Sequence, residues 1–318
     1  MFQHHGSARG LVLTRRTVSL LTVLWGTALC AAHARAGFDN YQLQETFALP
    51  AGAGAFDVLP DGRLITTAGA ELLLETAPGS RSFAGVGALA GADFNSFGPA
   101  FVRVSPDGSR VAIGNGGGAS FGNYKVGVFS LAGLGGWYSL GHYDAEWAND
   151  GRLALTAGDF GDPARVDVLD AASPFAAPDV TTVISGIGGA SGGITFDAAG
   201  RLYTANGFAG AGPSGTGVIR AFESSAWLAA LSGGTAESFE AGGTLVGEAL
   251  SGSSLGFDAA GNLHVGGGDF GSGDFGYAGL LRGSAVAQAV AGSGPVGASD
   301  TLALDPDVAN PFNFYDMN

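Results

Sequence analysis

One phrase recurs along this chain of 318 residues and limits the folds that it can adopt. Residues 194–207 read ITFDAAGRLYTANG, and residues 255–268 read LGFDAAGNLHVGGG. Earlier variants cover residues 55–66, 102–113 and 145–156. Each variant is a short apolar strand, a tight turn that ends in glycine and a second strand, which is the pattern of an antiparallel hairpin.

The glycines of these turns set the period of the repeat. Gly62, Gly108, Gly151, Gly200 and Gly261 follow one another at intervals of 46, 43, 49 and 61 residues. A period in the forties with several short strands per unit is typical of propeller blades. A blade is a four-stranded antiparallel sheet that buries its faces by stacking against other blades around an axis. The sequence therefore predicts an all-β fold, a β-propeller.

The number of blades follows from counting inner strands. We expect five inner strands at 55–59, 100–105, 143–147, 193–197 and 254–257, with 286–290 as the outer strand of the fifth blade. The tail 301–305 is in register to begin a sixth blade, so six blades is the prediction, with five or seven as alternatives.

The chain termini and one insertion complete the predicted propeller. The N-terminal strand 41–49 would close the last blade, together with Phe312, Phe314 and Tyr315, because closure removes exposed sheet edges. One short helical insertion would begin at Ser224 or Ser225 and end before Gly233. It would account for the 61-residue interval.

The first 36 residues resemble a signal peptide. Arg9, Arg15 and Arg16 precede an apolar run at 17–32, and Ala34-Arg35-Ala36 suits cleavage before Gly37. We therefore expect residues 1–36 to be removed on export, leaving 37–318 as a single propeller domain with no membrane span. The expected location is the periplasm or the extracellular space.

Composition excludes several kinds of chemistry. The single cysteine, Cys30, lies in the signal segment, so the mature chain would have no disulfide, thiol nucleophile or thiolate metal site. Only His142 and His264 would remain, which argues against a histidine-rich zinc or copper site. The net charge of −14 argues against nucleic acid and anionic membranes. We expect a monomer with an unknown protein or glycan partner.

Acidic and amide side chains recur in glycine-rich loops after the second strands. Propellers commonly bind ligands on the face where these loops open, and oxygen ligands suit Ca²⁺. The alternative, which we favour, is that Asp, Asn and Gly serve turn geometry alone. With two carboxylates at the start of blade three, the candidate ligand or metal-binding residues are Asn115, Asp144, Glu146, Asp159, Asp162, Asn206, Asp269 and Asp274.

The phrases Ser105-Pro106-Asp107-Gly108 and Phe-Asp-Ala-Ala-Gly resemble repeats of bacterial propellers. These include NHL-type repeats, WD-like repeats and the gluconolactonase-like superfamily. The resemblance implies the fold and leaves the function open, since such propellers include enzymes and binding modules.

For the gluconolactonase-like superfamily the resemblance implies six blades and a channel Ca²⁺ held at the starts of inner strands. Here those positions read Gly-Ala-Gly at 52–54 and Ser-Gly-Gly at 191–193, and only Asp144 and Glu146 supply carboxylates there. We expect His142 to be structural, with general-base catalysis as the alternative.

Three functions remain open at this point. The first, which we favour over an enzyme, is an exported binding module for a ligand or protein. The second is a metal-dependent hydrolase of the lactonase kind. The third is a structural protein of the cell envelope, which would expose an apolar patch for docking.

Overall fold

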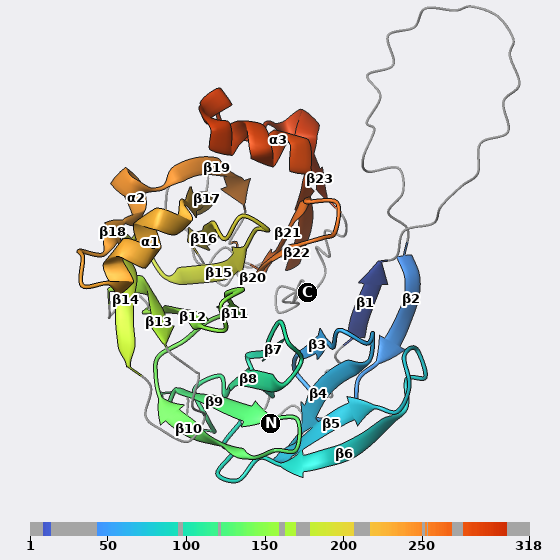
Figure 1. Cartoon of the computed structure of the whole chain (residues 1–318). Coiled ribbons are helices and arrows are strands. Elements are labelled where there is room, and N and C mark those ends of the chain that lie inside the picture. The colour runs from blue at the N-terminus through green and yellow to red at the C-terminus, as the bar shows by residue number, and fades with distance from the viewer. Residues whose placement is uncertain are drawn as a thin grey trace, which may run out of the picture. The chain divides into compact units, whose positions relative to one another are not determined.

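The computed structural model describes residues 9–13, 43–94, 98–119, 122–158, 163–169, 179–206, 217–249, 252, 254–268 and 276–303. The chain divides into two compact units, Met1–Leu49 and Pro50–Asn318. The described part of the second unit contains five sheets arranged around a common axis, antiparallel except for one added strand, and each sheet is one blade of a β-propeller (Figure 1).

In each blade the strands follow one another in the chain from the axis outward. Blade one contains β3 (Phe56–Val58), β4 (Leu64–Ala68), β5 (Glu71–Glu75) and β6 (Phe83–Ala88). Blade two contains β7 (Phe101–Val104), β8 (Arg110–Gly114), β9 (Lys125–Ser130) and β10 (Gly135–Ser139). Blade three contains β11 (Ala145–Trp147), β12 (Leu153–Ala157), β13 (Ala164–Leu169), β14 (Val180–Ile187) and the added parallel strand β18 (Glu237–Ser238).

The last two blades carry the helices. Blade four contains β15 (Ser191–Phe196), β16 (Leu202–Asn206), β17 (Gly217–Phe222) and β19 (Thr244–Ala249). Blade five contains β20 (Ser254–Phe257), β21 (Leu263–Gly268), β22 (Gly276–Leu281) and β23 (Thr301–Ala303).

The five repeated turns have the same backbone bond. In each, the N–H of the turn glycine donates to the carbonyl three residues earlier, as in Gly62 to Leu59 at 2.8 Å and Gly261 to Asp258 at 2.9 Å. All five glycines have positive φ, between 68° and 86°. A side chain at this position would be strained, so the turn glycine is fixed by geometry.

Four apolar clusters join the blades in sequence. The first lies between blades one and two and includes Ile65 and Ile113, and the second lies between blades two and three and includes Phe101 and Leu155. The third and fourth lie between blades three and four and between blades four and five. No cluster among the described residues joins blade five to blade one. Successive residues of a strand face opposite sides of a sheet, so one blade contributes to two clusters.

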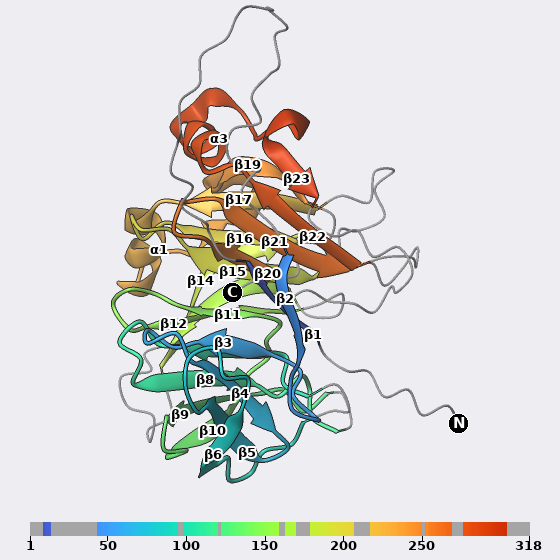
Figure 2. The same ribbon diagram turned by 90° about the vertical axis from the view of Figure 1, so that its right-hand side faces the viewer.

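Two helices follow the third strands of blades four and five. The predicted helix is confirmed as α1 (Ser224–Leu231), which begins after Glu223 and packs on β14 of blade three through Trp227. A second helix, α3 (Gly283–Gln288), packs toward blade four through Val286, and a short helix α2 (Phe239–Gly242) precedes β19. Figure 2 shows α1 and α3 beside the sheets and away from the inner strands. Each of these two helices extends the buried contact with the preceding blade.

The prediction of six blades is wrong for the described chain, which forms five. The segment 301–305 does not begin a sixth blade, because Thr301–Ala303 pairs with β22 as the outer strand of blade five. The place predicted for that outer strand, 286–290, is helical instead. Residues 283–289 read Gly-Ser-Ala-Val-Ala-Gln-Ala, whose alanines favour a helix. Asn262 Oδ1 accepts the first helical N–H, that of Gly283, at 2.8 Å.

The first unit contains a two-stranded antiparallel sheet of β1 (Arg9–Leu13) and β2 (Leu43–Ala48). The described partner of β2 is therefore β1, and closure of a blade by the strand 41–49 stays a prediction. Phe312, Phe314 and Tyr315 lie outside the described residues. Within the described ranges, no helix combines the length and the apolar character that a membrane crossing requires.

Candidate functional site

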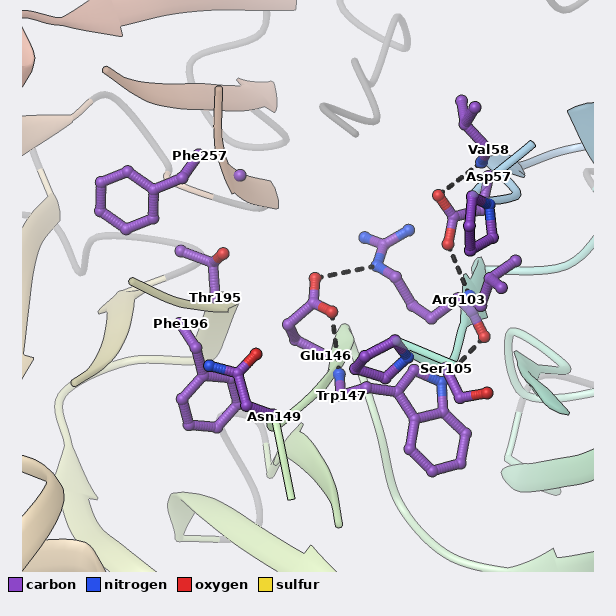
Figure 3. A pocket seen from close by; sticks show the side chains of 14 residues that line it. Asp57, Val58, Arg103, Ser105, Glu146, Trp147, Asn149, Thr195, Phe196 and Phe257 are labelled. Atoms are coloured by element: carbon purple, nitrogen blue, oxygen red, sulfur yellow. Dashed lines mark hydrogen bonds and ion pairs between the residues drawn. The ribbon is translucent and has the colours of Figure 1, made fainter. Parts of the chain in front are cut away.

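Each inner strand places one equivalent residue at the axis. These residues stand five positions before the turn glycine of their repeat, and we call them the axial ring: Asp57, Arg103, Glu146, Thr195 and Gly256. All five line one cavity of about 360 Å³, together with the residue that follows each of the first four and with Phe257 (Figure 3). The cavity therefore arises directly from the repeat.

The cavity lies at one end of the axis. Pro60, Pro106 and Asn149, which line it, belong to the turns between first and second strands. The loops after the second strands, where the sequence analysis placed most candidate ligands, are at the opposite ends of these antiparallel strands. The described cavity and the predicted ligand face are thus two different ends of the propeller.

Charge is distributed unequally around the axial ring. Blades one to three contribute Asp57, Arg103 and Glu146, whereas blades four and five contribute Thr195 and Gly256. In Figure 3 the charged side chains lie together on one side of the cavity, and Phe196 and Phe257 lie on the other. The cavity therefore has a charged side and an apolar side.

Arg103 is committed to a buried ion pair. Its Nη2 lies 2.7 Å from Asp144 Oδ1, and both side chains are less than 5% exposed. Its Nε donates to the Ala145 carbonyl at 2.9 Å. Asp144 in turn accepts the N–H of Ile194 in blade four at 3.1 Å, so this pair connects blades two, three and four. The positive charge of Arg103 is thereby neutralised by Asp144.

Glu146 has a different environment. Its Oε2 lies 4.0 Å from Arg103 Nε, and its Oε1 accepts the N–H of Trp147 at 2.8 Å. The side chain is 27% exposed, and it faces the cavity, where the surrounding protein separates it from bulk water. Burial raises the pKa of Glu146 to about 8; Arg103 opposes this effect, and the negative charges of Asp57 and Asp144 add to it. Glu146 can therefore change protonation near neutral pH.

Asp57 supplies a second carboxylate to the cavity. Its Oδ1 accepts the N–H of Val58 at 2.6 Å, and its Oδ2 accepts the N–H of Val104 in blade two. With Asp144 and Glu146, Asp57 makes three carboxyl groups beside the single guanidinium of Arg103, so the wall of the cavity is acidic in composition and favours cations or hydrogen-bond donors.

Two further polar side chains at the cavity have no side-chain hydrogen bond to the residues that the structure describes. Thr195 is only 4% exposed, and its hydroxyl makes no hydrogen bond to another described residue. Asn149 lies at the rim, and its amide likewise makes no hydrogen bond within the described part of the chain. Buried polar groups are usually hydrogen-bonded, so an unpartnered hydroxyl at a cavity wall suits water or a ligand.

The described candidate residues of the opposite face, Asn115 and Asn206, form hydrogen bonds to backbone groups of nearby segments. Asn115 is fully buried, and its Oδ1 accepts the N–H of Lys125 at 2.8 Å while its Nδ2 donates to the Asn123 carbonyl. Asn206 makes the same kind of bonds, to the N–H of Val218 and the Gly188 carbonyl. Asn115 thus joins the two ends of the connection between β8 and β9, whereas Asn206 joins β17 to Gly188 in the segment before β15.

The other candidates divide into two groups. Asp144 and Glu146 lie within the inner strand region of blade three, as described above. The remaining four, Asp159, Asp162, Asp269 and Asp274, lie outside the described residues. Their role as ligands stays a prediction.

Calcium does not fit the residues that the structure describes. No group of three or more His, Cys, Asp or Glu side chains there could hold a metal ion. Ca²⁺ takes six to eight oxygen ligands, whereas the described Asn115 and Asn206 oxygens accept backbone N–H groups and Asp144 accepts Arg103 and Ile194. We therefore derive no chemistry through a metal.

His142 is a structural residue at the border of blades two and three. Its Nε2 accepts the N–H of Gly116 at 3.3 Å, its Nδ1 lies 3.1 Å from the Leu140 carbonyl, and its ring packs edge-on against Phe101. This pattern assigns the proton to Nδ1. Burial lowers the pKa of His142 to about 4, so the ring is neutral at pH 7.

The sequence analysis did not single out Asp57, Arg103 or Thr195. The signal was present in the spacing: counting back five residues from each turn glycine gives all five members of the axial ring. The loops after the second strands carry the more conspicuous Asp, Asn and Gly residues, which drew the prediction to the other face. Alternation within the short inner strands does not by itself tell which residue faces the axis.

Comparison with known proteins adds structural likenesses only. The chain matches no protein-family model and no curated protein. Similar solved structures include a calcium-binding protein, regucalcin, from Agrobacterium tumefaciens, at 15% identity and a TM-score of 0.46, covering 70% of each chain. Another is oligogalacturonate lyase from Vibrio parahaemolyticus, at 11% identity and a TM-score of 0.48, covering 83% of this chain and 69% of that one. Likenesses of this size assign no family, and the propeller assignment rests on the five sheets.

Proposed function

We propose that this chain is an exported propeller that binds a small organic ligand in its axial cavity. The observation that carries the proposal is the axial ring, in which Asp57 and Glu146 face a cavity of about 360 Å³ whose other side is aromatic. Cavities of roughly 300–1,000 Å³ with a few placed polar groups are typical of small-molecule sites.

Glu146 supports this proposal because its position is costly to the fold. A carboxyl whose pKa is raised to about 8 is destabilised as an anion in the folded protein. A hydrophobic or amide residue would fill the same place without that cost. Functional sites are where such perturbed groups concentrate.

The test is thermal unfolding of residues 37–318 with a panel of small ligands that includes organic amines, neutral sugars and sugar lactones. A ligand that binds the folded state at 100 times its Kd stabilises it by about 2.7 kcal/mol. We expect at least one class to raise the Tm of the wild type and to lose that effect in Glu146→Gln. Glu248→Gln, the same change at an exposed residue of β19 that does not line the cavity, is the matched control and should retain the shift. Absence of a shift for every class contradicts the proposal.

A second candidate is a hydrolase of the lactonase kind, with Glu146 as general base. The observation that favours it is the pKa of about 8, because a general base works best when its pKa is near the working pH. Hydrolysis of a sugar lactone should then rise with pH up to about 8 and fall at least 100-fold in Glu146→Gln. Binding of the lactone without turnover would leave only the binding function.

Calcium is proposed separately, at the loops that carry Asp159, Asp162, Asp269 and Asp274. Thermal unfolding in EDTA and then with added Ca²⁺ tests it. A rise in Tm that disappears in Asp159→Asn and Asp269→Asn supports a metal site on that face. An unchanged Tm would leave these loops with turn chemistry alone.

A further inference from the structure

A second cavity adjoins the axial one. It has a volume of about 320 Å³ and lies between the turns of blades three and four and helix α1. Asn149 and Phe196 line both cavities, so the two spaces share a wall. A ligand that passes over Phe196 can therefore occupy both.

The chemistry changes from one cavity to the other. The axial cavity has the carboxylates of Asp57 and Glu146, whereas the second cavity is lined largely by apolar groups. These are Ala148, Phe196, Ala198, Ala199, Trp227 and Leu228. Asp150, Ser224 and Asn149 are its polar lining side chains, and Asp150 is engaged by Arg152. The combined space is acidic at its inner end and apolar at its outer end.

Asn149 stands where the two cavities meet, and its residue type is unusual for its place in the repeat. The equivalent position, two before the turn glycine, is Pro60 in blade one, Pro106 in blade two and alanine in blades four and five. Those residues bring no side-chain hydrogen-bonding group, whereas the amide of Asn149 brings donors and an acceptor. No described residue uses them. Asn149 is thus placed to bond the middle of a ligand.

The charge of the inner end selects a cation. Three carboxyl groups, those of Asp57, Asp144 and Glu146, lie at this end with one guanidinium, that of Arg103, which pairs with Asp144 at 2.7 Å and lies 4.0 Å from Glu146. Acidic groups therefore outnumber basic ones at the cavity wall. The edges and faces of Phe196 and Phe257 are close by, and aromatic rings attract cations. An acidic chain with a net charge of −14 also attracts cations from solution.

From these features we infer that the ligand is an organic amine with an apolar or aromatic body, whose ammonium group lies between Asp57 and Glu146 and whose body extends over Phe196 into the second cavity, with Asn149 as a positioning residue. The inference rests on the proposed function of the axial cavity. When the ammonium binds, Glu146 gives up its carboxyl proton to solvent and remains as the carboxylate, while the amine keeps its own proton.

The first experiment uses phenethylamine as the probe, with 2-phenylethanol as its neutral counterpart and ethylamine as the head group alone. We expect phenethylamine to bind at least tenfold more tightly than either, by titration calorimetry at pH 7. The measured enthalpy should depend on the buffer, because binding releases a proton from Glu146. Equal affinity for 2-phenylethanol would overturn the inference but not the proposed function.

The pH profile gives a second readout. Asp57, Arg103 and Asp144 are the charged groups around Glu146. With the carboxylate form of Glu146 required, affinity for phenethylamine should rise about tenfold per pH unit below pH 8 and level off above it. In Glu146→Gln the profile should be flat over this range. A flat profile in the wild type would overturn the role of Glu146.

The second cavity is tested by filling it. Ala198→Phe should weaken phenethylamine binding at least tenfold and leave ethylamine binding unchanged. Ala259→Phe is the matched control, because Ala259 is the equivalent exposed turn residue of blade five and lines neither described cavity. Asn149→Pro, which introduces the residue of blades one and two, should weaken binding about threefold to tenfold, the value of one hydrogen bond.

These outcomes separate the two proposals. If Ala198→Phe behaves like Ala259→Phe while Glu146→Gln abolishes binding, the amine is confined to the axial cavity and the second cavity plays no part. If no member of the ligand panel stabilises the wild type, the proposed function itself fails.

Discussion

Blades one to three and blades four and five are built on the same repeat, yet they differ at the axis and at the periphery. The first three blades place charged residues in the axial ring and have Pro-Asp-Gly or Asn-Asp-Gly turns. The last two place Thr195 and Gly256 there, have Ala-Ala-Gly turns and add α1 and α3 after their third strands. One half therefore supplies the charge of the cavity, and the other half supplies its apolar wall and extra packing.

The difference shows that the residues that form a blade and the residue that the blade places at the axis can vary independently. The turn glycine and the apolar residues of the inner strand are needed in every blade, because they form the hairpin and the contact with the next blade. The axial residue faces the cavity, and its type differs from blade to blade: Arg103 and Asp57 also bond to a neighbouring blade, whereas the hydroxyl of Thr195 has no described partner. Variants in the two groups of blades test this difference, and the largest effect is expected at Arg103.

Arg103→Ala should be the most damaging change in the axial ring. It leaves Asp144 buried without its ion-pair partner at 2.7 Å, and breaking a buried pair in this way costs about 3–5 kcal/mol. Urea unfolding measures the loss. Thr195→Val is the control at the equivalent position of blade four; it removes a hydroxyl that has no described partner and should change stability by less than about 0.5 kcal/mol. Equal effects would mean that the two halves do not differ.

Glu146→Gln should stabilise the protein at alkaline pH. The folded pKa of about 8 exceeds the unfolded value, so between about pH 4.5 and 8 the folded state holds more protons. Wild-type stability therefore falls as pH rises through this window, by a few kcal/mol at most on the order-of-magnitude conversion of such a shift. The advantage of Glu146→Gln, measured by urea unfolding, should grow from pH 5 to pH 8. A constant difference would show that Glu146 has an ordinary pKa.

The two described histidines extend the comparison to acidic pH. Burial lowers the pKa of His142 to about 4, below its unfolded value, so this group destabilises the fold as pH falls from about 6.5 to 4, by about 3 kcal/mol. Burial also lowers the pKa of His264 in blade five, but Asp258, 3.5 Å away, opposes the shift. NMR titration should therefore find His142 protonating at lower pH than His264. The reverse order would contradict the assigned environments.

The turn residues should matter least. Pro60→Ala makes the turn of blade one resemble that of blade four, and the loss of backbone restriction in the unfolded chain should cost about 0.4–1 kcal/mol. Pro106→Ala should behave alike and serves as the comparison. A decrease of more than about 2 kcal/mol in the free energy of unfolding of either variant would mean that the proline stabilises the packing of the blade as well as the turn.

Much of the fold was accessible from the sequence because its repeat is local. The turn glycines predicted five hairpins, and all five have the expected positive φ. The helix α1 was predicted as an apolar segment that ends before Gly233, although the helix begins after Glu223 without a side-chain cap. The sixth blade was predicted wrongly because a strand as short as 301–303 has no pattern that distinguishes an inner strand from an outer one. The segment before it forms helix α3, so the outer edge of β22 pairs with 301–303 instead.

The site was less accessible. Asp144 and Glu146 are carboxylates only two residues apart in the sequence. The positions of Arg103 and Ile194 decide that the first forms a buried ion pair while the second lines the cavity. Such assignments depend on contacts between residues of different blades, which no local pattern encodes. Asn115 and Asn206 were predicted as ligands because the sequence does not show which backbone groups they bind. The N–H groups that their Oδ1 atoms accept belong to residues 10 and 12 positions further along the chain.

The register of the axial ring has a consequence for how such a cavity can change. Each repeat places a single side chain of the equivalent position at the axis, so five residues, one from each inner strand, determine most of the chemistry of the cavity wall. Where the side chain is not engaged by a neighbouring blade, as with Thr195, its replacement alters the lumen while the blade-to-blade cores stay as they are. New ligand preferences could thus be acquired one blade at a time, without rebuilding the scaffold.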